Sequence, residues 1–310
     1  GVWSLAEAFA YSKAGLWPTA GNAAPRALFA GGENGGGRIN VIDYIQIASA
    51  GNAVDFGDMD TARENFAGTL ASKTRGVIGG GPVSPDDYMQ YVTIATTGNT
   101  TTFGNLLTGV SVGAGASSET RGLFGGGNGP SNVIQYITIA SVGNATDFGD
   151  LSAARTYPSA CASPTRALFG GGSGGTNVID YVTIASTGNA ASFGNLSVSR
   201  FAAASCSSST RGVFGGGYDS AALNVIDYVT IASTGNATDF GDLLFSTLYF
   251  SAASSNTRGV FGGGNTYPTW SNVLQYITIA STGNATDFGD LTVARSSVSG
   301  MSNAHGGLAA

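Results

Sequence analysis

Six arginines stand at nearly equal intervals along the chain and form its most regular set of chemically active side chains. They are Arg26, Arg75, Arg121, Arg166, Arg211 and Arg258, at steps of 49, 46, 45, 45 and 47 residues. Guanidinium groups brought together in a ring could hold an anion. The sequence favours a structural role instead, in which each arginine reaches an acidic turn. The acids of these turns are Asp55, Asp58, Asp147, Asp150, Asp239, Asp242, Asp287 and Asp290.

Calcium is a further candidate ligand for these acidic turns. Two of the units carry Thr102 with Asn105, and Ser192 with Asn195, where the others carry acids. A calcium site needs several oxygen ligands, carboxylates among them, so a site repeated in every unit is disfavoured. Turn hydrogen bonding by Asp and Asn side chains accounts for both residue types equally well.

Catalytic side chains are sparse. The single histidine, His305, stands near the C-terminal end, where we expect a frayed segment, and no Ser-His-Asp set can be built around it. No His or Cys cluster has the spacing of a metal site, so we expect no cofactor. We expect no enzymatic activity. A secreted carbohydrate-active enzyme remains the alternative because four carboxylates fall on variable loops, although no two have a spacing that singles them out: Glu33, Asp86, Asp87 and Asp219.

The two cysteines, Cys161 and Cys206, occupy the same position in successive units. Equivalent atoms of neighbouring units are expected to lie beyond the Cα separation of about 4.4–6.8 Å that a disulfide requires. We therefore predict that both are small, buried and unbonded.

The elements that must position all these residues repeat with the period of the arginines. Each unit has three runs rich in Val, Ile, Phe, Tyr and Thr and a fourth run of small residues, separated by Gly, Asn and Ser clusters that mark turns. In the fourth unit we place strands at residues 167–170, 178–186 and 190–196, followed by the small-residue run 198–207. Six four-stranded units of this length predict an all-β, six-bladed β-propeller with antiparallel strands.

The way the ends are cut predicts how the ring closes. The first unit begins at its second strand, residues 27–29, and the last unit is followed by an unpaired run, residues 293–303. We predict that this run supplies the inner strand of the first blade, which removes exposed sheet edges and locks the ring. The propeller then covers residues 23–310. Residues 1–22 form an extension in which a capping box and a glycine stop predict a short helix, for docking on the propeller or for oligomeric assembly.

Charge and hydropathy exclude two classes of partner. The net charge of −6 would repel a phosphate backbone, so we expect no nucleic-acid binding. No run of 18 or more apolar residues exists, so we expect no insertion into a membrane.

Comparison of the units with one another separates the two faces of the predicted disc. With the strands of a unit lettered a to d from the axis outward, the a–b and c–d turns barely vary, whereas the b–c loops and d–a connections differ in length and chemistry. Loops on a rigid scaffold usually carry binding, although relaxed constraint would produce the same variation. Aromatic platforms near Asn and Asp suit sugar faces or a protein partner. The candidate binding residues on this variable face are Trp270, Tyr267, Tyr218, Asp219, Tyr157, Phe201 and Tyr249.

The unit resembles the kelch repeat. The shared features are an apolar strand ending in paired glycines, Phe214-Gly215-Gly216, then Tyr228, Phe240 and Leu243, with an arginine before the next unit as at Arg200. The resemblance runs from about Ala24 to the C-terminal end, and it implies a propeller fold. Kelch repeats usually carry Trp where this chain has Phe240 and its equivalents.

The recurring Gly-Asn-Ala-Thr-Asp-Phe-Gly-Asp turns, and the opening Gly-Val-Trp-Ser-Leu, are similar to repeat-containing structural proteins of tailed bacteriophages of marine bacteria. This resemblance implies a structural or adhesive module of a virion or tail fibre. Its expected partners are other virion proteins or a cell-surface glycan. A secreted or cell-surface location, or an intracellular kelch-type interaction module, are the alternatives.

Overall fold

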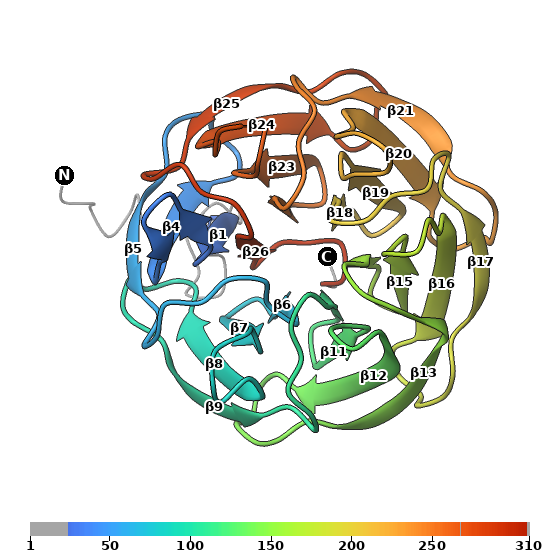
Figure 1. The fold of residues 1–310 in the computed structure, drawn as a ribbon, viewed down its shortest axis with the longest axis horizontal. Helices are drawn as coiled ribbons and strands as arrows, with labels where there is room; N and C mark the ends of the chain where they lie inside the picture. The colour runs from blue at the N-terminus through green and yellow to red at the C-terminus, as the bar shows by residue number, and fades with distance from the viewer. Residues whose placement is uncertain (1–23, 267, 309–310) are drawn as a thin grey trace, which may run out of the picture.

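The computed structural model describes residues 24–266 and 268–308, which form a disc of six four-stranded antiparallel sheets around a central axis (Figure 1). The predicted six-bladed β-propeller is confirmed. No helix is present in the described part of the chain. The helix predicted within residues 1–22 lies outside the described residues, and so does the candidate site residue Tyr267.

In each blade the strands pair in the order a to d from the axis to the rim. The strands of the first three blades are β26 (Ser299–Ser302), β1 (Arg26–Ala30), β4 (Val41–Gln46) and β5 (Val54–Asp58); β6 (Gly68–Ala71), β7 (Arg75–Gly79), β8 (Tyr88–Thr93) and β9 (Thr101–Asn105); β10 (Ala114–Ser117), β11 (Arg121–Gly125), β12 (Ser131–Thr138) and β13 (Thr146–Arg155). Those of the last three are β14 (Ser159–Ala162), β15 (Arg166–Gly170), β16 (Val178–Thr183) and β17 (Ala191–Asn195); β18 (Ala204–Ser207), β19 (Arg211–Gly215), β20 (Val225–Thr230) and β21 (Thr238–Asp242); β22 (Ser251–Ser254), β23 (Arg258–Gly262), β24 (Val273–Thr278) and β25 (Thr286–Asp290).

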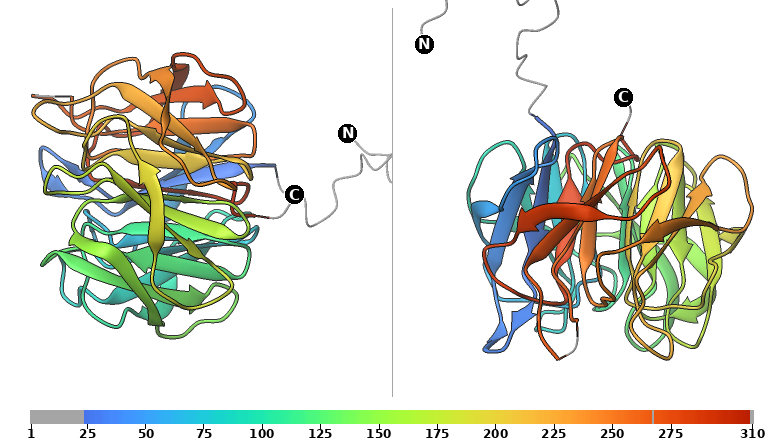
Figure 2. Two further views of the ribbon diagram at one scale, coloured as in Figure 1. Left: turned by 90° about the vertical axis from the view of Figure 1, so that its right-hand side faces the viewer. Right: turned by 90° about the horizontal axis from the view of Figure 1, so that it is seen from above.

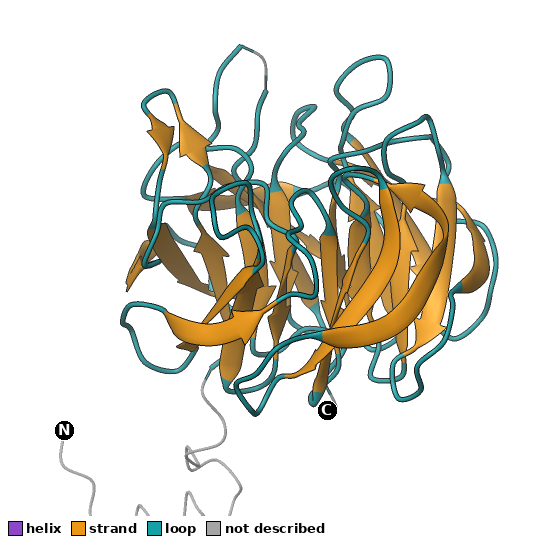
Figure 3. Ribbon diagram, turned by 60° about the horizontal axis from the view of Figure 1, so that its bottom comes forward, coloured by secondary structure: helices purple, strands orange, loops and turns teal. Residues whose placement is uncertain are grey.

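The b–c loops and d–a connections gather on one face of the disc, which we call the variable face. A small hairpin, β2 (Glu33–Asn34) with β3 (Gly37–Arg38), stands on it within the b–c loop of the first blade (Figure 3). The C-terminal end lies at the opposite face, with the a–b and c–d turns (Figure 2). The structure therefore separates the varied loops from the repeated turns, as the sequence predicts.

The ring closes through its two ends. Strand β26 pairs antiparallel with β1, in a register that sets Ala27 opposite Ser302 and Ala30 opposite Ser299. The predicted closure of the first blade is confirmed. The strand is shorter than the predicted run of residues 293–303 because the chain from Leu291 to Val298 first crosses the variable face.

The hydrophobic core lies between the blades. Phe169 on β15 is fully buried and packs towards the third blade, where a Cβ on Gly125 would lie 2.6 Å from the phenylalanine ring. The glycine that ends strand b therefore makes room for the aromatic ring of the next blade. This contact explains the repeated phrase Phe-Gly-Gly-Gly.

A second inter-blade contact explains the fixed Gly-Asn-Ala and Phe-Gly-Asp phrases. Gly188, in the c–d turn of the fourth blade, donates its backbone N–H to the carbonyl oxygen of Phe148 on β13 of the third blade (2.7 Å), and Asp150 donates its N–H to Asn189 Oδ1 (3.1 Å). The chains approach so closely that a Cβ on Gly149 would lie 2.4 Å from the carbonyl oxygen of Gly188. The c–d turn is thus a clasp onto the preceding blade.

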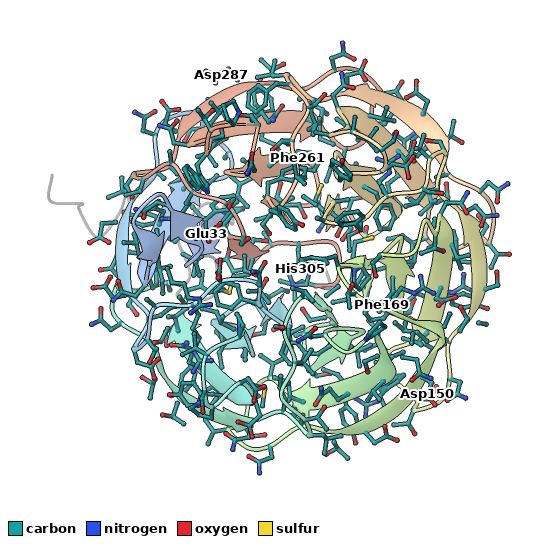
Figure 4. The ribbon with its side chains drawn as sticks, in the orientation of Figure 1. Glu33, Asp150, Phe169, Phe261, Asp287 and His305 are labelled. Atoms are coloured by element: carbon teal, nitrogen blue, oxygen red, sulfur yellow. The ribbon has the colours of Figure 1, made fainter. Side chains whose placement is uncertain are left out.

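The expected pairing of the six repeated arginines with acids is wrong. Arg75 stacks its guanidinium 4.3 Å from the centre of the Tyr91 ring and donates from Nη1 to the carbonyl oxygen of Ile139 in the next blade (2.9 Å). The expected acidic partners sit in the outermost strands, and Figure 4 places Asp150 and Asp287 at the rim of the disc. Each arginine therefore tethers neighbouring blades through a tyrosine and a carbonyl. The same pair of contacts recurs at Arg26, Arg75, Arg121, Arg166, Arg211 and Arg258.

The cysteine prediction is confirmed, since Cys161 and Cys206 are both buried and unbonded. The expectation of a frayed C-terminal end is wrong. His305 lies near the axis (Figure 4), where its Nε2 is 2.9 Å from the carbonyl oxygen of Ala71. Gly306 donates its N–H to the carbonyl oxygen of Ser207 (3.0 Å), so residues 303–308 close the axial channel at the turn face. We call this segment the C-terminal plug.

Candidate functional site

The variable face opens at the axis into a pocket of about 140 Å³. Every blade contributes equivalent residues to its wall, from the d–a connection and the beginning of strand a. A deeper cavity of about 60 Å³ continues along the axis and reaches His305 of the C-terminal plug. The axial channel is therefore open on the variable face and closed on the other.

The mouth of the pocket is a ring of six equivalent residues, which we call the collar. Each has a left-handed backbone, with φ between 48° and 54°. From Val112 to Ser297, each member donates its backbone N–H to the carbonyl oxygen of the preceding member, as from Tyr157 to Val112 (2.7 Å) and from Ser297 to Tyr249 (2.6 Å). The members in chain order are Asn65, Val112, Tyr157, Ala202, Tyr249 and Ser297.

All six collar residues adopt an unfavourable left-handed backbone conformation. A non-glycine residue in the left-handed region costs on the order of 1–3 kcal/mol and persists where the surroundings impose it. Here the hydrogen bonds between successive members hold this conformation, because from Val112 to Ser297 each N–H must meet the carbonyl oxygen of the preceding member. The backbone is thus held constant while the six side chains differ in kind.

Four of the predicted site residues meet at one side of the collar and form an aromatic cluster. The ring centres of Tyr157 and Tyr249 lie 5.3 Å apart, those of Tyr157 and Phe201 6.0 Å, and those of Phe201 and Tyr218 5.5 Å. Phe201 and Tyr218 also exchange backbone hydrogen bonds of 3.0 and 2.9 Å, which fix the b–c loop of the fifth blade to its d–a connection. Ala202 lies between the two collar tyrosines in the collar order, and its small side chain lets their rings meet.

The opposite side of the mouth is polar. Asn65 lies three collar positions from Ala202, and Ser297 is its neighbour across the ring closure. The residue before Asn65 is Glu64, which is buried and accepts a hydrogen bond from Arg38 Nε (2.9 Å). The pocket therefore has an aromatic half and a polar half.

Two carboxyl groups meet beside the polar half. Burial raises the pKa of Glu33, a hydrogen bond and the negative charge of Glu64 raise it further, and a hydrogen bond from Trp270 and the charge of Arg38 oppose these effects. Burial also raises the pKa of Tyr157 to about 12, with smaller contributions from Tyr249 and Glu64. Tyr157 is therefore a neutral hydrogen-bonding phenol at physiological pH.

Trp270 lies apart from the aromatic cluster, whereas Asp219 follows its member Tyr218 in the chain. The Trp270 side chain belongs to the b–c loop of the sixth blade and is 37% exposed, and a Cβ on Gly35 of the first-blade hairpin would lie 3.4 Å from its ring. Trp270 thus spans two blades at the rim of the variable face. Asp219 is exposed beside Tyr218 and donates its backbone N–H to the carbonyl oxygen of Ala221 (3.1 Å).

Sequence reasoning missed the polar half of the mouth. Glu64 and Asn65 carry no aromatic ring and no repeat signal, so nothing in their own types distinguishes them. Aligning the d–a connections on the first residue of strand a would have placed Val112, Tyr157, Ala202, Tyr249 and Ser297 in one column, with Asn65 shifted by one residue. That column contains five of the six collar residues.

Buried ion pairs hold several d–a connections beneath the collar. Arg155 Nη2 lies 2.5 Å from Asp180 Oδ2, and the side chain of Ser152 donates to the same oxygen (2.7 Å). Equivalent pairs join Arg200 to Asp227 and Arg295 to Asp43. These ion pairs hold the d–a connections in place, and their side chains do not line the pocket.

The arrangement is suited to holding a ligand between an aromatic wall and polar groups. Among residues 24–266 and 268–308 no group of three or more His, Cys, Asp or Glu side chains is placed to bind a metal ion. The described chain also contains no helix long and apolar enough to cross a membrane. No protein-family model matches the chain, and no curated protein matches it in sequence.

Proposed function

We propose that this protein is a non-enzymatic binding module that attaches to a cell-surface glycan or to another protein through its variable face, as an adhesive component of a phage virion or tail fibre. The observation that carries the proposal is the aromatic cluster at the mouth of the axial pocket. Its members Tyr157, Phe201 and Tyr249 come from the d–a connections that enter three successive blades, and the two tyrosines line the pocket. The six collar positions share one backbone conformation, and the two tyrosines make one side of the ring different from the other.

The scaffold supports this function through its rigidity. The clasps, the arginine tethers and the collar all join one blade to the next, so a ligand meets a preformed surface. A preformed surface loses little conformational entropy on binding. The propeller fold is also in keeping with a kelch-like interaction module, and an intracellular protein partner remains an alternative occupant of the same face. The proposed location in a phage particle is supported by the resemblance of the repeated Gly-Asn-Ala-Thr-Asp-Phe-Gly-Asp motif to phage structural proteins.

The pair formed by Glu33 and Glu64 bears on the alternative of a carbohydrate-active enzyme. Glycosidases keep their two carboxyl groups about 5 Å or more apart, so that the sugar bond or a water molecule fits between them. Glu64 lies close enough to Glu33 to raise the pKa of Glu33, and Arg38 Nε donates a hydrogen bond to Glu64 (2.9 Å). This geometry favours a structural brace of the hairpin over a catalytic pair.

A glycan array and a hydrolysis assay on the same glycans test the proposal with the full chain. We expect retention of specific glycans with no released product. Release of product would contradict the adhesive function and favour the enzyme. Mass spectrometry and immunogold labelling of purified particles test the virion setting, and absence of the chain from every particle fraction would contradict it.

A further inference from the structure

We infer that the axial pocket binds one neutral sugar ring, which enters end-on as the terminal residue of a glycan. The inference rests on the proposed function and deepens it, because it names the part of the variable face that is occupied and the class of ligand that fits.

The size of the pocket sets the size of the ligand. A cavity of about 150 Å³ holds one six-membered ring, whereas pockets for drug-sized molecules measure about 300–1,000 Å³. The axial pocket has about 140 Å³, and the channel below it narrows to a cavity of about 60 Å³ that ends at the C-terminal plug. A single ring fits, and a chain passing through does not.

The aromatic half offers an apolar wall. Tyr157 and Tyr249 flank Ala202 in the collar, and their rings meet edge to face at 5.3 Å. Sugar rings present C–H groups on their faces and hydroxyl groups at their edges, which matches an aromatic side chain with a polar tip. The pKa of Tyr157 is raised, chiefly by burial and also by a hydrogen bond with Tyr249, so its phenol stays neutral at the edge of this wall.

The remaining wall is rich in acceptors. Thr69 and Ser205 line the pocket and donate their hydroxyl protons to the carbonyl oxygens of Gly300 and Ala160, each at 2.7 Å. Their oxygens keep lone pairs that accept hydrogen bonds from a ligand. Asn65 supplies an amide with both a donor and an acceptor at the mouth. Sugar hydroxyl groups are the matching donors.

Charge selects against acidic sugars. No lysine or arginine stands among the residues that line the described pocket, and Glu64 lies directly beside Asn65 of the collar. The chain as a whole carries a net charge of −6. A sugar carboxylate would enter a site whose lining offers it no cation, and Glu64 is already paired with Arg38, so neutral rings are preferred.

The test measures binding of single sugars to the full chain by saturation-transfer NMR and calorimetry. The probes are the methyl glycosides of glucose, galactose, mannose and N-acetylglucosamine, the glucuronide as an acidic counterpart of the glucoside, and phenol as an apolar ring. We expect at least one neutral glycoside to bind with a Kd on the order of 1 mM. We expect the glucuronide to bind several-fold more weakly than the glucoside.

The collar supplies matched variants. Tyr157→Ala and Tyr249→Ala introduce the residue that Ala202 already carries with the same left-handed backbone, so folding should be preserved and is checked by the melting temperature. Each should weaken binding of the neutral glycoside by about five- to tenfold. Val142→Ala changes an exposed residue in a c–d turn of the opposite face and should leave the affinity for the single sugar unchanged.

Several results would overturn the inference. Binding of phenol without any glycoside, or tighter binding of the glucuronide, would show a different ligand class. If array glycans bind the chain, lose affinity in Trp270→Ala and keep it in both tyrosine variants, the variable face binds through its rim; the proposed function then stands and the pocket assignment fails. If no array glycan and no glycoside binds, the assignment also fails, and competition by the purified chain for particle adsorption to cells decides the proposed function separately.

Discussion

Arg200 Nη2 lies 2.6 Å from Asp227 Oδ2, and neither side chain exposes any surface to solvent. Arg200 belongs to the connection that enters the fifth blade and Asp227 to strand β20 of that blade, so the pair fastens the base of the collar to the blade wall. The sixth blade performs the same task without charge, since Gln275 Oε1 accepts a hydrogen bond from the backbone N–H of Leu244 (2.7 Å) and Thr247 stands at the position of Arg200.

Breaking this ion pair should be costly, and replacing it as a unit should not. Arg200→Thr leaves Asp227 buried without its cation, and losses of about 3–5 kcal/mol are typical of such a change. The double variant Arg200→Thr with Asp227→Gln copies the pair found in the sixth blade and should recover most of the loss. Urea unfolding of Arg200→Thr, Asp227→Gln and the double variant measures the coupling free energy between the two positions. A double variant as unstable as the worse single one would contradict this view.

Closure of the ring predicts unequal effects of two truncations. Removing residues 292–310 deletes β26 and the C-terminal plug, and it exposes the backbone edge of β1. Removing residues 1–20 leaves every described strand in place. The first truncation should lower the melting temperature far more than the second. Equal melting temperatures would contradict closure by the C-terminal strand.

The close approach of neighbouring blades at the clasp can be tested with two glycines that have similar φ angles. Gly149 has a φ of 144° and Gly188 a φ of 153°, but a Cβ on Gly149 would lie 2.4 Å from a carbonyl oxygen, whereas a Cβ on Gly188 would have open space. Gly149→Ala should therefore cost clearly more stability than Gly188→Ala, by about 1–3 kcal/mol. Equal losses of unfolding free energy would show that backbone strain alone, and not the approach of the blades, fixes these glycines.

The C-terminal plug should loosen in acid. His305 Nδ1 accepts a hydrogen bond from the N–H of Gly307 (3.1 Å), which requires the neutral imidazole, and burial lowers its pKa from 6.5. The cavity that His305 lines also contains Cys161 and Cys206, whose pKa values are raised by burial so that both stay neutral. The unfolded segment therefore binds a proton more readily than the folded one.

The sign of the pH effect follows. Stability that depends on neutral His305 is fully present above the unfolded pKa of about 6.5, and it is lost as the pH falls below that value towards the lowered pKa of the folded state. Hydrogen exchange of residues 303–308 at pH 7.5 and pH 5 measures it, with His305→Asn as a variant that should respond less. Equal protection of the wild-type segment at both pH values would contradict the prediction.

Much of the fold could be predicted from sequence because it depends on local chemistry that repeats. Runs of Val, Ile, Phe and Tyr make strands, glycine and asparagine make turns, and a period near 45 residues makes blades. The two ends of the chain likewise indicated how the ring closes. The first unit lacks its inner strand, and an unpaired strand follows the last unit, so the second can complete the first. Tyr157, Phe201, Tyr218 and Tyr249 could be selected as departures from the repeat.

Contacts between blades could not be predicted, because they depend on how one unit stacks on the next. The sequence offered Arg75 several acids of opposite charge, but stacking placed them on the outer strand and brought the carbonyl oxygen of Ile139 to the guanidinium instead. The collar, the meeting of Glu64 with Asn65 at the pocket mouth and the capture of His305 at the axis have the same origin. The sequence by itself determined what each blade is, and only the tertiary structure decided what the blades make together, because the site is assembled from single residues that lie some 45 positions apart.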